Sequence, residues 1–208
     1  DHAVKVALVS NNENGKRDAA LLLCCFGTGL KPTELAMLKI SDYLLANGDV
    51  KTETIVRPEI AFNGRSRPLL WVNKKLVNAI EAHLSERLER GLGVTNRPAA
   101  YRGLDPDSGL FVSGRTGEAL KVSKQIKGGK AYYSAEQVSA LIIKLFNQAG
   151  IEGASALSGR RSLGVKLNRR GIDLRHIGEI LGMTSLKAIK QLCETDPVKL
   201  GDLIKGII

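Results

Sequence analysis

The chain has 208 residues, with 31 Lys or Arg against 21 Asp or Glu, so its formal net charge is +10 and its pI is about 9.7. Hydrophobic residues make up 43% and charged residues 25%, a balance that excludes a disordered tail. No apolar run approaches the roughly 18 residues of a membrane span, and the first residues lack a signal-peptide pattern. We expect one domain over 1–208 and, because the first residue is not Met, a fragment of a longer protein.

The spacing of cysteine and histidine argues against disulfides and metal sites. The cysteines are Cys24, Cys25 and Cys193, and the histidines are His2, His83 and His176. An odd cysteine count without a C-x-x-C pair predicts buried free thiols in a reducing cytoplasm. Since no H-x-x-H or HExxH spacing exists, we expect no metal and no cofactor.

The first third of the chain predicts two helices and a hairpin. DAALLLCCF at 18–26 indicates a helix with Asp18 as its N-cap. After GTGL, Pro32 suits the first position of a second helix. The segments TETIV, EIAF and RPLLWV at 52–56, 59–62 and 67–72 predict strands, with Asn63-Gly64 as the hairpin turn.

The rest of the chain predicts loops and helices. Residues 74–90 have the apolar spacing of an amphipathic helix. Residues 91–130 are rich in Gly, Pro and Ser, which indicates loops around short segments. Ser134 is placed to cap a helix that runs to Gln148, with Gln137 completing a capping box. Three short helices follow, at about 159–170, behind Asp173, and behind Thr184 or Ser185, with stops at Gly171 and Gly182. The predicted fold class is mainly α with a small antiparallel β-sheet (α+β).

The positive charge is concentrated late in the chain. From Lys121 to Lys190 there are 13 basic residues and 4 acidic ones, a balance of 13 − 4 = +9. Such clustering favours the phosphates of nucleic acid, and the 4% of aromatic residues favours double-stranded DNA over stacked single strands. A solvated surface is the alternative.

Three segments carry longer motifs: GTGLKPTEL at 27–35, FNGRSRPLLWV at 62–72, and SGRRS at 158–162 continuing through RGIDLRHIGEILG at 170–182 to Asp196-Pro197. In this order they resemble the C-terminal catalytic domain of tyrosine recombinases (phage integrases). The corresponding family patterns are TGLRxSEL, a hairpin ending in R-x-x-P-L, and H-x-L-R-[HR]-[ST]…G-V-D-L-x-x-I-x-x-L-G-H…Y…D-P. The resemblance covers essentially the whole chain and implies an integrase catalytic-domain-like fold.

The resemblance also implies where catalytic groups belong. In the family a tyrosine attacks a DNA phosphodiester, two arginines hold its oxygens, a hairpin lysine protonates the leaving oxygen and histidines assist. By position, the tyrosine falls at Leu192 and the two arginines fall at Lys31 and Arg160. The hairpin lysine falls near Phe62, and the histidines fall at Leu157 and Met183. Leucine and methionine side chains neither attack nor exchange protons, and a lysine cannot bind phosphate as a guanidinium does. The resemblance therefore implies a catalytically inactive member of the family.

An active recombinase with a displaced nucleophile stays open as an alternative. The other candidate nucleophiles are Tyr43, Tyr101, Tyr132, Tyr133 and Cys193. The tyrosines are remote in sequence from the third of the late helices. Cys193 neighbours Leu192, but an ordinary half-buried thiol is the expected state.

We expect Arg160 to contact a DNA phosphate, with Lys31 beside it. The full set of predicted DNA contacts is Arg160, Lys31, Arg161, Arg65, Arg67, Lys124, Lys127, Lys187 and Lys190. The alternatives are a salt bridge for Arg160, a charged hairpin edge for the two hairpin arginines, and solvated lysines in a mobile basic loop at 121–130. Glu34 and Asp42 are expected to be structural, and Trp71 to belong to the core.

DLRHIGEILGMTSLKAIKQL at 173–192 also fits a helix-turn-helix whose second helix carries Lys187 and Lys190 into a major groove. The full-length resemblance favours the recombinase-like domain. We therefore predict a duplex DNA-binding regulator or accessory factor of the cytoplasm, associated with the nucleoid. The apolar tail LGDLIKGII at 200–208 suggests contact with a second copy or a recombinase partner, and a pure protein-interaction module is a further alternative.

Overall fold

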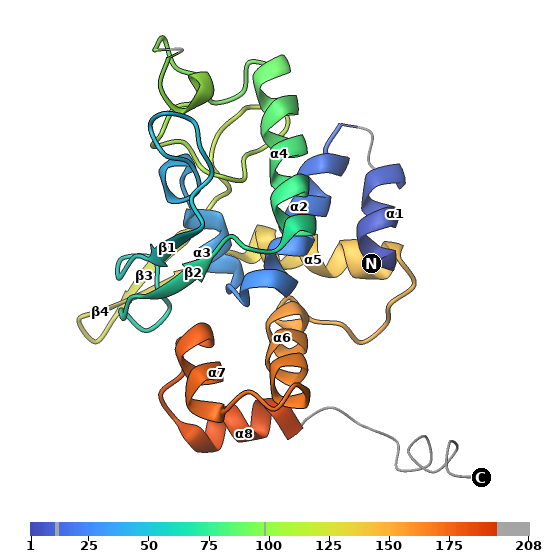
Figure 1. Cartoon of the computed structure of the whole chain (residues 1–208), viewed down its shortest axis with the longest axis vertical. Helices are drawn as coiled ribbons and strands as arrows, with labels where there is room; N and C mark the ends of the chain where they lie inside the picture. The colour runs from blue at the N-terminus through green and yellow to red at the C-terminus, as the bar shows by residue number, and fades with distance from the viewer. Residues whose placement is uncertain (11–12, 98, 195–208) are drawn as a thin grey trace.

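The computed structural model describes residues 1–10, 13–97 and 99–194 (Figure 1). Its elements in chain order are α1 (His2–Ser10), α2 (Gly15–Thr28), α3 (Pro32–Met37), the 3₁₀ turn η1 (Ile40–Asp42), β1 (Glu53–Val56), β2 (Arg67–Leu70), α4 (Lys74–Glu89), the 3₁₀ turn η2 (Tyr101–Gly103), β3 (Ser123–Lys127), β4 (Lys130–Ser134), α5 (Glu136–Gln148), α6 (Ser158–Arg169), α7 (Leu174–Leu181) and α8 (Leu186–Glu194). Helices dominate, and the strands form two antiparallel pairs, which confirms the predicted fold class. Asp196-Pro197 and the tail at 200–208 lie outside the described residues. Within the described ranges, no helix is both long and apolar enough to cross a bilayer.

The larger of two hydrophobic clusters surrounds α2. This helix packs against α1, α4 and α6, and its side chains from Leu21 to Cys25 are largely removed from solvent. The helix begins at Gly15, with Asn14 at the N-cap position, so the prediction that Asp18 is the cap is wrong. Asp18 instead lies in the first turn, fully buried, and accepts hydrogen bonds from the neighbouring Arg17 guanidinium.

The β1–β2 hairpin contains two of the three predicted strands, but the predicted Asn63-Gly64 turn between EIAF and RPLLWV is wrong, because RPLL pairs with ETIV. Val56 pairs with Arg67, so residues 57–66 form the connection and EIAF at 59–62 is not a strand. Within this connection the amides of Ile60 and Ala61 both donate to the carbonyl of Arg57, which is turn geometry. Both side chains are buried, so the apolar run reflects packing of a turn onto the core.

A second hairpin was missed. Residues 121–130 were predicted as loop, but β3 and β4 pair from Ser123–Ser134 to Lys127–Lys130, and Gly128 and Gly129 both have positive φ in the turn. The predicted cap of the following helix is also wrong, because Ala135 occupies the N-cap position of α5 and the Ser134 hydroxyl lies 3.4 Å from Glu136 Oε1. Ser134 therefore ends a strand, which keeps it out of the cap geometry.

The last three helices form a separate, smaller cluster and confirm the predicted pattern. Asp173 caps α7 by accepting a hydrogen bond from the amide of Arg175, and Gly182 ends that helix with φ +66°. Ile177, Leu181 and Ile189 are the buried centre of this C-terminal cluster. Figure 1 shows the three helices together at one end of the molecule, below α2 and the hairpins.

The C-terminal cluster docks on the main core through a close helix contact. α6 packs on α2, and a Cβ placed on Gly159 would lie 2.7 Å from Cys25 Cβ and 2.9 Å from its carbonyl oxygen. These atoms belong to the backbone or are the first side-chain carbon, so a change of side-chain rotamer cannot move them out of the way. Glycine is therefore required at this position for the helices to approach.

Gly159→Ala is expected to lower the free energy of unfolding by about 1–3 kcal/mol, because the added methyl group forces α6 away from α2. Urea denaturation monitored by circular dichroism measures this change. Ser162→Ala on the same helix controls for helix propensity and is expected to have little effect. Equal stability of the two variants would contradict the tight contact.

Candidate nucleic-acid interface

The side chains at the positions matched to the family's catalytic residues meet in one pocket. It has a volume of about 230 Å³ and is lined by Lys31, Phe62, Leu157, Arg160, Arg161, Met183 and Leu192. We call it the cationic pocket. It lies where the start of α3, the β1–β2 connection and the C-terminal cluster come together, so residues more than 160 positions apart share it.

Lys31 and Phe62 form the mouth of the cationic pocket. Lys31 is half-buried at the N-cap position of α3, and its Nζ lies 3.6 Å from the centre of the Phe62 ring, a cation–π contact. Burial lowers the pKa of Lys31 from its ordinary value, and the charge of Arg160 lowers it further. An anion beside Nζ would oppose both effects, because a negative charge favours the protonated form of the lysine.

Arg160 is fixed at the base of the pocket. Its Nη1 donates to the carbonyl of Gly29 at 2.8 Å and its Nη2 to the carbonyl of Leu181 at 2.5 Å, so it spans both clusters. Burial lowers its pKa to about 10, which keeps it charged at neutral pH, and the nearby Arg67 charge acts in the same direction. Within the described part of the chain, Arg160 therefore does not form the salt bridge considered as an alternative, because both of its hydrogen-bond partners are carbonyls.

The prediction that Arg67 contacts a DNA groove is corrected by its ion pair. Arg67 and Arg160 are equally buried, each 5% exposed, but the Arg67 guanidinium donates two parallel hydrogen bonds, each 2.7 Å, to the fully buried Glu34 carboxylate and does not line the cationic pocket. Glu34 also accepts from the backbone amides of Lys31 and Phe62. The carboxylate thus fixes both mouth residues of the cationic pocket, which confirms a structural role for Glu34. Asp42 pairs similarly with Arg57, and Trp71 is buried as predicted.

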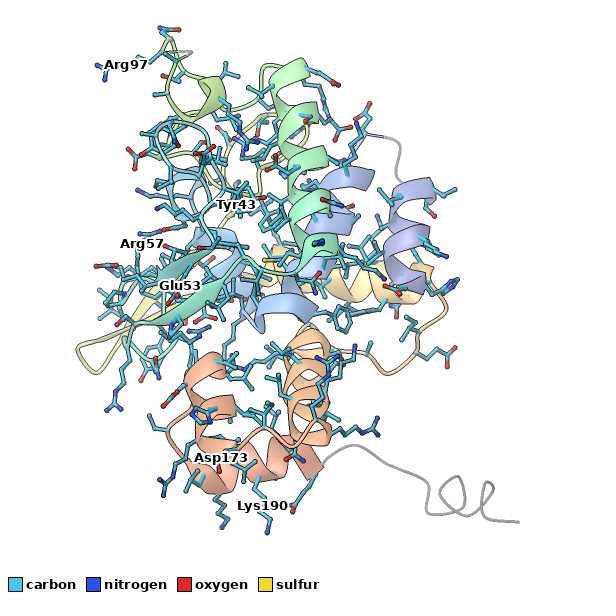
Figure 2. The ribbon with its side chains drawn as sticks, viewed as in Figure 1. Tyr43, Glu53, Arg57, Arg97, Asp173 and Lys190 are labelled. Atoms are coloured by element: carbon cyan, nitrogen blue, oxygen red, sulfur yellow. The ribbon has the colours of Figure 1, made fainter. Side chains whose placement is uncertain are left out.

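The other predicted DNA contacts are spread over the surface. Arg161 is exposed and lines the cationic pocket, whereas Arg65 is exposed in the β1–β2 connection outside it. Lys124 is exposed on β3; Lys127 ends the same strand, but its side chain lies outside the described part. Lys187 and Lys190 are exposed on α8 and do not line the pocket, and Figure 2 places Lys190 at the opposite end of the molecule from Arg97.

Two of the alternative nucleophiles are removed from the pocket by burial. Tyr43 is buried in the main core, donates to Glu81, and has its pKa raised mainly by burial (Figure 2). Cys193 is 5% exposed with its thiol 3.7 Å from the Gly164 carbonyl, and burial raises its pKa, which opposes formation of a thiolate. Tyr101 is partly buried in η2, packed against the main core, and does not line the pocket.

Sequence reasoning missed a groove beside the cationic pocket. This groove of about 920 Å³ runs between the β1–β2 connection and β4, and its lining includes Tyr132 and Tyr133 as well as Lys31, Phe62 and Leu157 from the pocket. The Gly-Gly turn signal at 128–129 was the available clue to the strand that forms its wall. In the described part of the chain, no group of three or more His, Cys, Asp or Glu side chains is placed to hold a metal ion.

Comparison with known proteins identifies the family. The model of the phage integrase family matches residues 2–192. The chain belongs to the phage integrase family. It is 27% identical over 187 residues to the tyrosine recombinase XerC of Roseiflexus castenholzii (strain DSM 13941 / HLO8), covering 89% of this chain and 50% of that protein. The chain thus spans about half the length of this curated relative.

Solved structures of this family share the fold. The XerA recombinase matches with a TM-score of 0.64 and 21% identity, over 99% of this chain and 61% of XerA. The Tn1549 transposon integrase, solved in complex with transposon right end DNA, matches with a TM-score of 0.58 and 12% identity, over 90% of this chain and 58% of the integrase. At these identities the likeness is one of fold.

Glu34→Gln is expected to lower the free energy of unfolding by about 3–5 kcal/mol, because the neutral amide leaves the buried Arg67 charge uncompensated. Chemical denaturation measures the loss. Asp107→Asn is the matched control, since it removes the same charge from the exposed pair between Lys39 and Asp107 and is expected to leave stability nearly unchanged. Equal losses of unfolding free energy in the two variants would show that the buried pair contributes no more to stability than the exposed pair.

Proposed function

We propose that this family member binds duplex DNA, holds a phosphate between Lys31 and Arg160, and does not cleave the strand. The observation that carries the proposal is the lining of the cationic pocket: two cations meet there with Leu157, Met183 and Leu192. The cations suit a phosphate, whereas the three apolar side chains supply no nucleophile, acid or base.

Electrostatics favours an anion in this pocket. Lys31 and Arg160 approach the same Phe62 ring, at 3.6 Å and 5.2 Å from its centre, and Arg161 adds a third positive charge at the rim. The nearest buried carboxylate, Glu34, is already engaged by Arg67. A bound phosphate reduces the mutual repulsion of these cations, and in duplex DNA each such contact releases counterions.

The biological role that follows is regulatory or accessory. A protein that occupies DNA without breaking it serves as a regulator, an accessory factor or an organiser of a mobile element, and acts at the nucleoid in the cytoplasm. Association with a second copy or with an active recombinase belongs to the same proposal. Sedimentation with and without DNA tests that part of it.

Lys31→Gln is expected to weaken binding to duplex DNA and to reduce the slope of log affinity against log salt by about 1, because one phosphate contact is lost. Fluorescence anisotropy at several salt concentrations measures both. Lys5→Gln removes an exposed charge on α1 that does not line the pocket and serves as the control. The proposed phosphate contact is wrong if the two variants behave alike.

A nicked suicide duplex tests the absence of cleavage. We expect no covalent protein–DNA adduct on a denaturing gel when the duplex is one selected by this protein from a random pool, because none of the described residues that line the pocket carries a hydroxyl or thiol group. A trapped adduct would refute the inactive assignment.

That result would favour the second candidate, a recombinase with a displaced nucleophile. The specific observation behind it is that Tyr132 and Tyr133 line the groove that shares Lys31, Phe62 and Leu157 with the pocket. Tyr132→Phe and Tyr133→Phe in the same assay then identify the attacking residue, since only its loss abolishes the adduct.

A further inference from the structure

The β3–β4 hairpin exposes apolar and aromatic side chains on both of its faces. Cross-strand pairing puts Lys124 opposite Tyr133 and Ile126 opposite Ala131 on one face, and Gln125 opposite Tyr132 on the other. Ile126 is 71% exposed, Tyr132 54% and Tyr133 43%. An isolated two-stranded hairpin is marginally stable in water, so a hairpin with this composition gains from a partner.

The charge of the hairpin identifies the chemistry of that partner. Four lysines recur at every third position, Lys121, Lys124, Lys127 and Lys130, and the sequence has no acidic residue between Glu118 and Glu136. The last two of these lysines are paired in register on either side of the Gly-Gly turn. A lysine-rich, acid-free ribbon is complementary to a polyanion, and apolar groups between the lysines suit the base edges of a groove.

The position of the hairpin connects it to the cationic pocket. Residues 131–134 of β4 form one wall of the 920 Å³ groove, and the β1–β2 connection forms the opposite wall. The groove shares Lys31, Phe62 and Leu157 with the cationic pocket, so β4 lies beside the residues of the proposed phosphate site. Both hairpins project from the same side of the molecule in Figure 1.

We propose that the β3–β4 hairpin lies in the major groove of duplex DNA next to the phosphate held by Lys31 and Arg160. This inference rests on the proposed function and adds a second contact to it. The major groove is about 12 Å wide and admits a two-stranded ribbon, whereas the minor groove is about half as wide. A five-residue strand is about 17 Å long, enough to span that width. Lys124 reaches a backbone phosphate and Ile126 contacts base edges such as the thymine methyl group.

The test uses a double substitution with a matched control. Lys124→Gln with Ile126→Ser removes one exposed charge and one exposed aliphatic side chain from the hairpin. Lys144→Gln with Ile143→Ser removes the same pair of side chains from the exposed face of α5. Circular dichroism melts of both variants establish that the body of the protein is folded.

Two measurements are expected to separate these variants. The hairpin variant should bind duplex DNA about tenfold more weakly, with a salt slope reduced by about 1, and the control should match the unsubstituted chain. Dimethyl sulfate footprinting should show protection of guanine N7, which lies in the major groove, and this protection should disappear in the hairpin variant alone.

Several outcomes would overturn the proposal. Equal affinity and equal N7 protection in both variants would exclude a hairpin contact, while Lys31→Gln would still report on the phosphate site. Hairpin-dependent protection of adenine N3 would place the hairpin in the minor groove instead. A change in self-association without a change in DNA affinity would make the hairpin a protein contact. No DNA binding by the unsubstituted chain would refute the proposed function and this inference together.

Discussion

The Glu34 carboxylate holds together the parts of the molecule on which the cationic pocket depends. It accepts hydrogen bonds from the Arg67 guanidinium on β2, from the backbone of Lys31 at the start of α3, and from the backbone of Phe62 in the connection between the strands. A buried carboxylate demands such partners, because an unpaired charge away from water is costly. The same charge balance therefore fixes the strand, the helix start and the loop in one geometry.

The arginines extend this arrangement to the C-terminal cluster. The Arg67 side chain lies against Gly182, where a Cβ would come within 2.8 Å of its Cδ, and Asn63 donates to the Gly182 carbonyl at 3.0 Å. Arg160 makes a second connection by bonding the carbonyls of Gly29 and Leu181. The two hydrophobic clusters thus meet through glycines and guanidinium groups, in addition to the packing of α6 on α2 and of α7 on β2.

The sequence predicted what depends on local chemistry. Asp173 and Gly182 bound α7 as expected, because capping and a left-handed stop act within one turn of a helix. The segment at 59–62 was predicted as a strand but lies in a turn, because apolar side chains can pack on the core from either structure. The same holds for Arg67, whose partner Glu34 is 33 positions away and is brought to it only by the tertiary fold. The family resemblance located the residues of the cationic pocket, but their roles in binding DNA stay predictions.

The division into two clusters has a thermodynamic consequence for the cationic pocket. Lys31 and Phe62 belong to the main body, whereas Met183 and Leu192 belong to the C-terminal cluster, so the pocket exists only while the two are docked. Any anion that binds there selects the docked form over a form with the helices separated. An anion bound in the pocket therefore stabilises the contact between the C-terminal cluster and the main body, in addition to the hydrogen bonds that already join them.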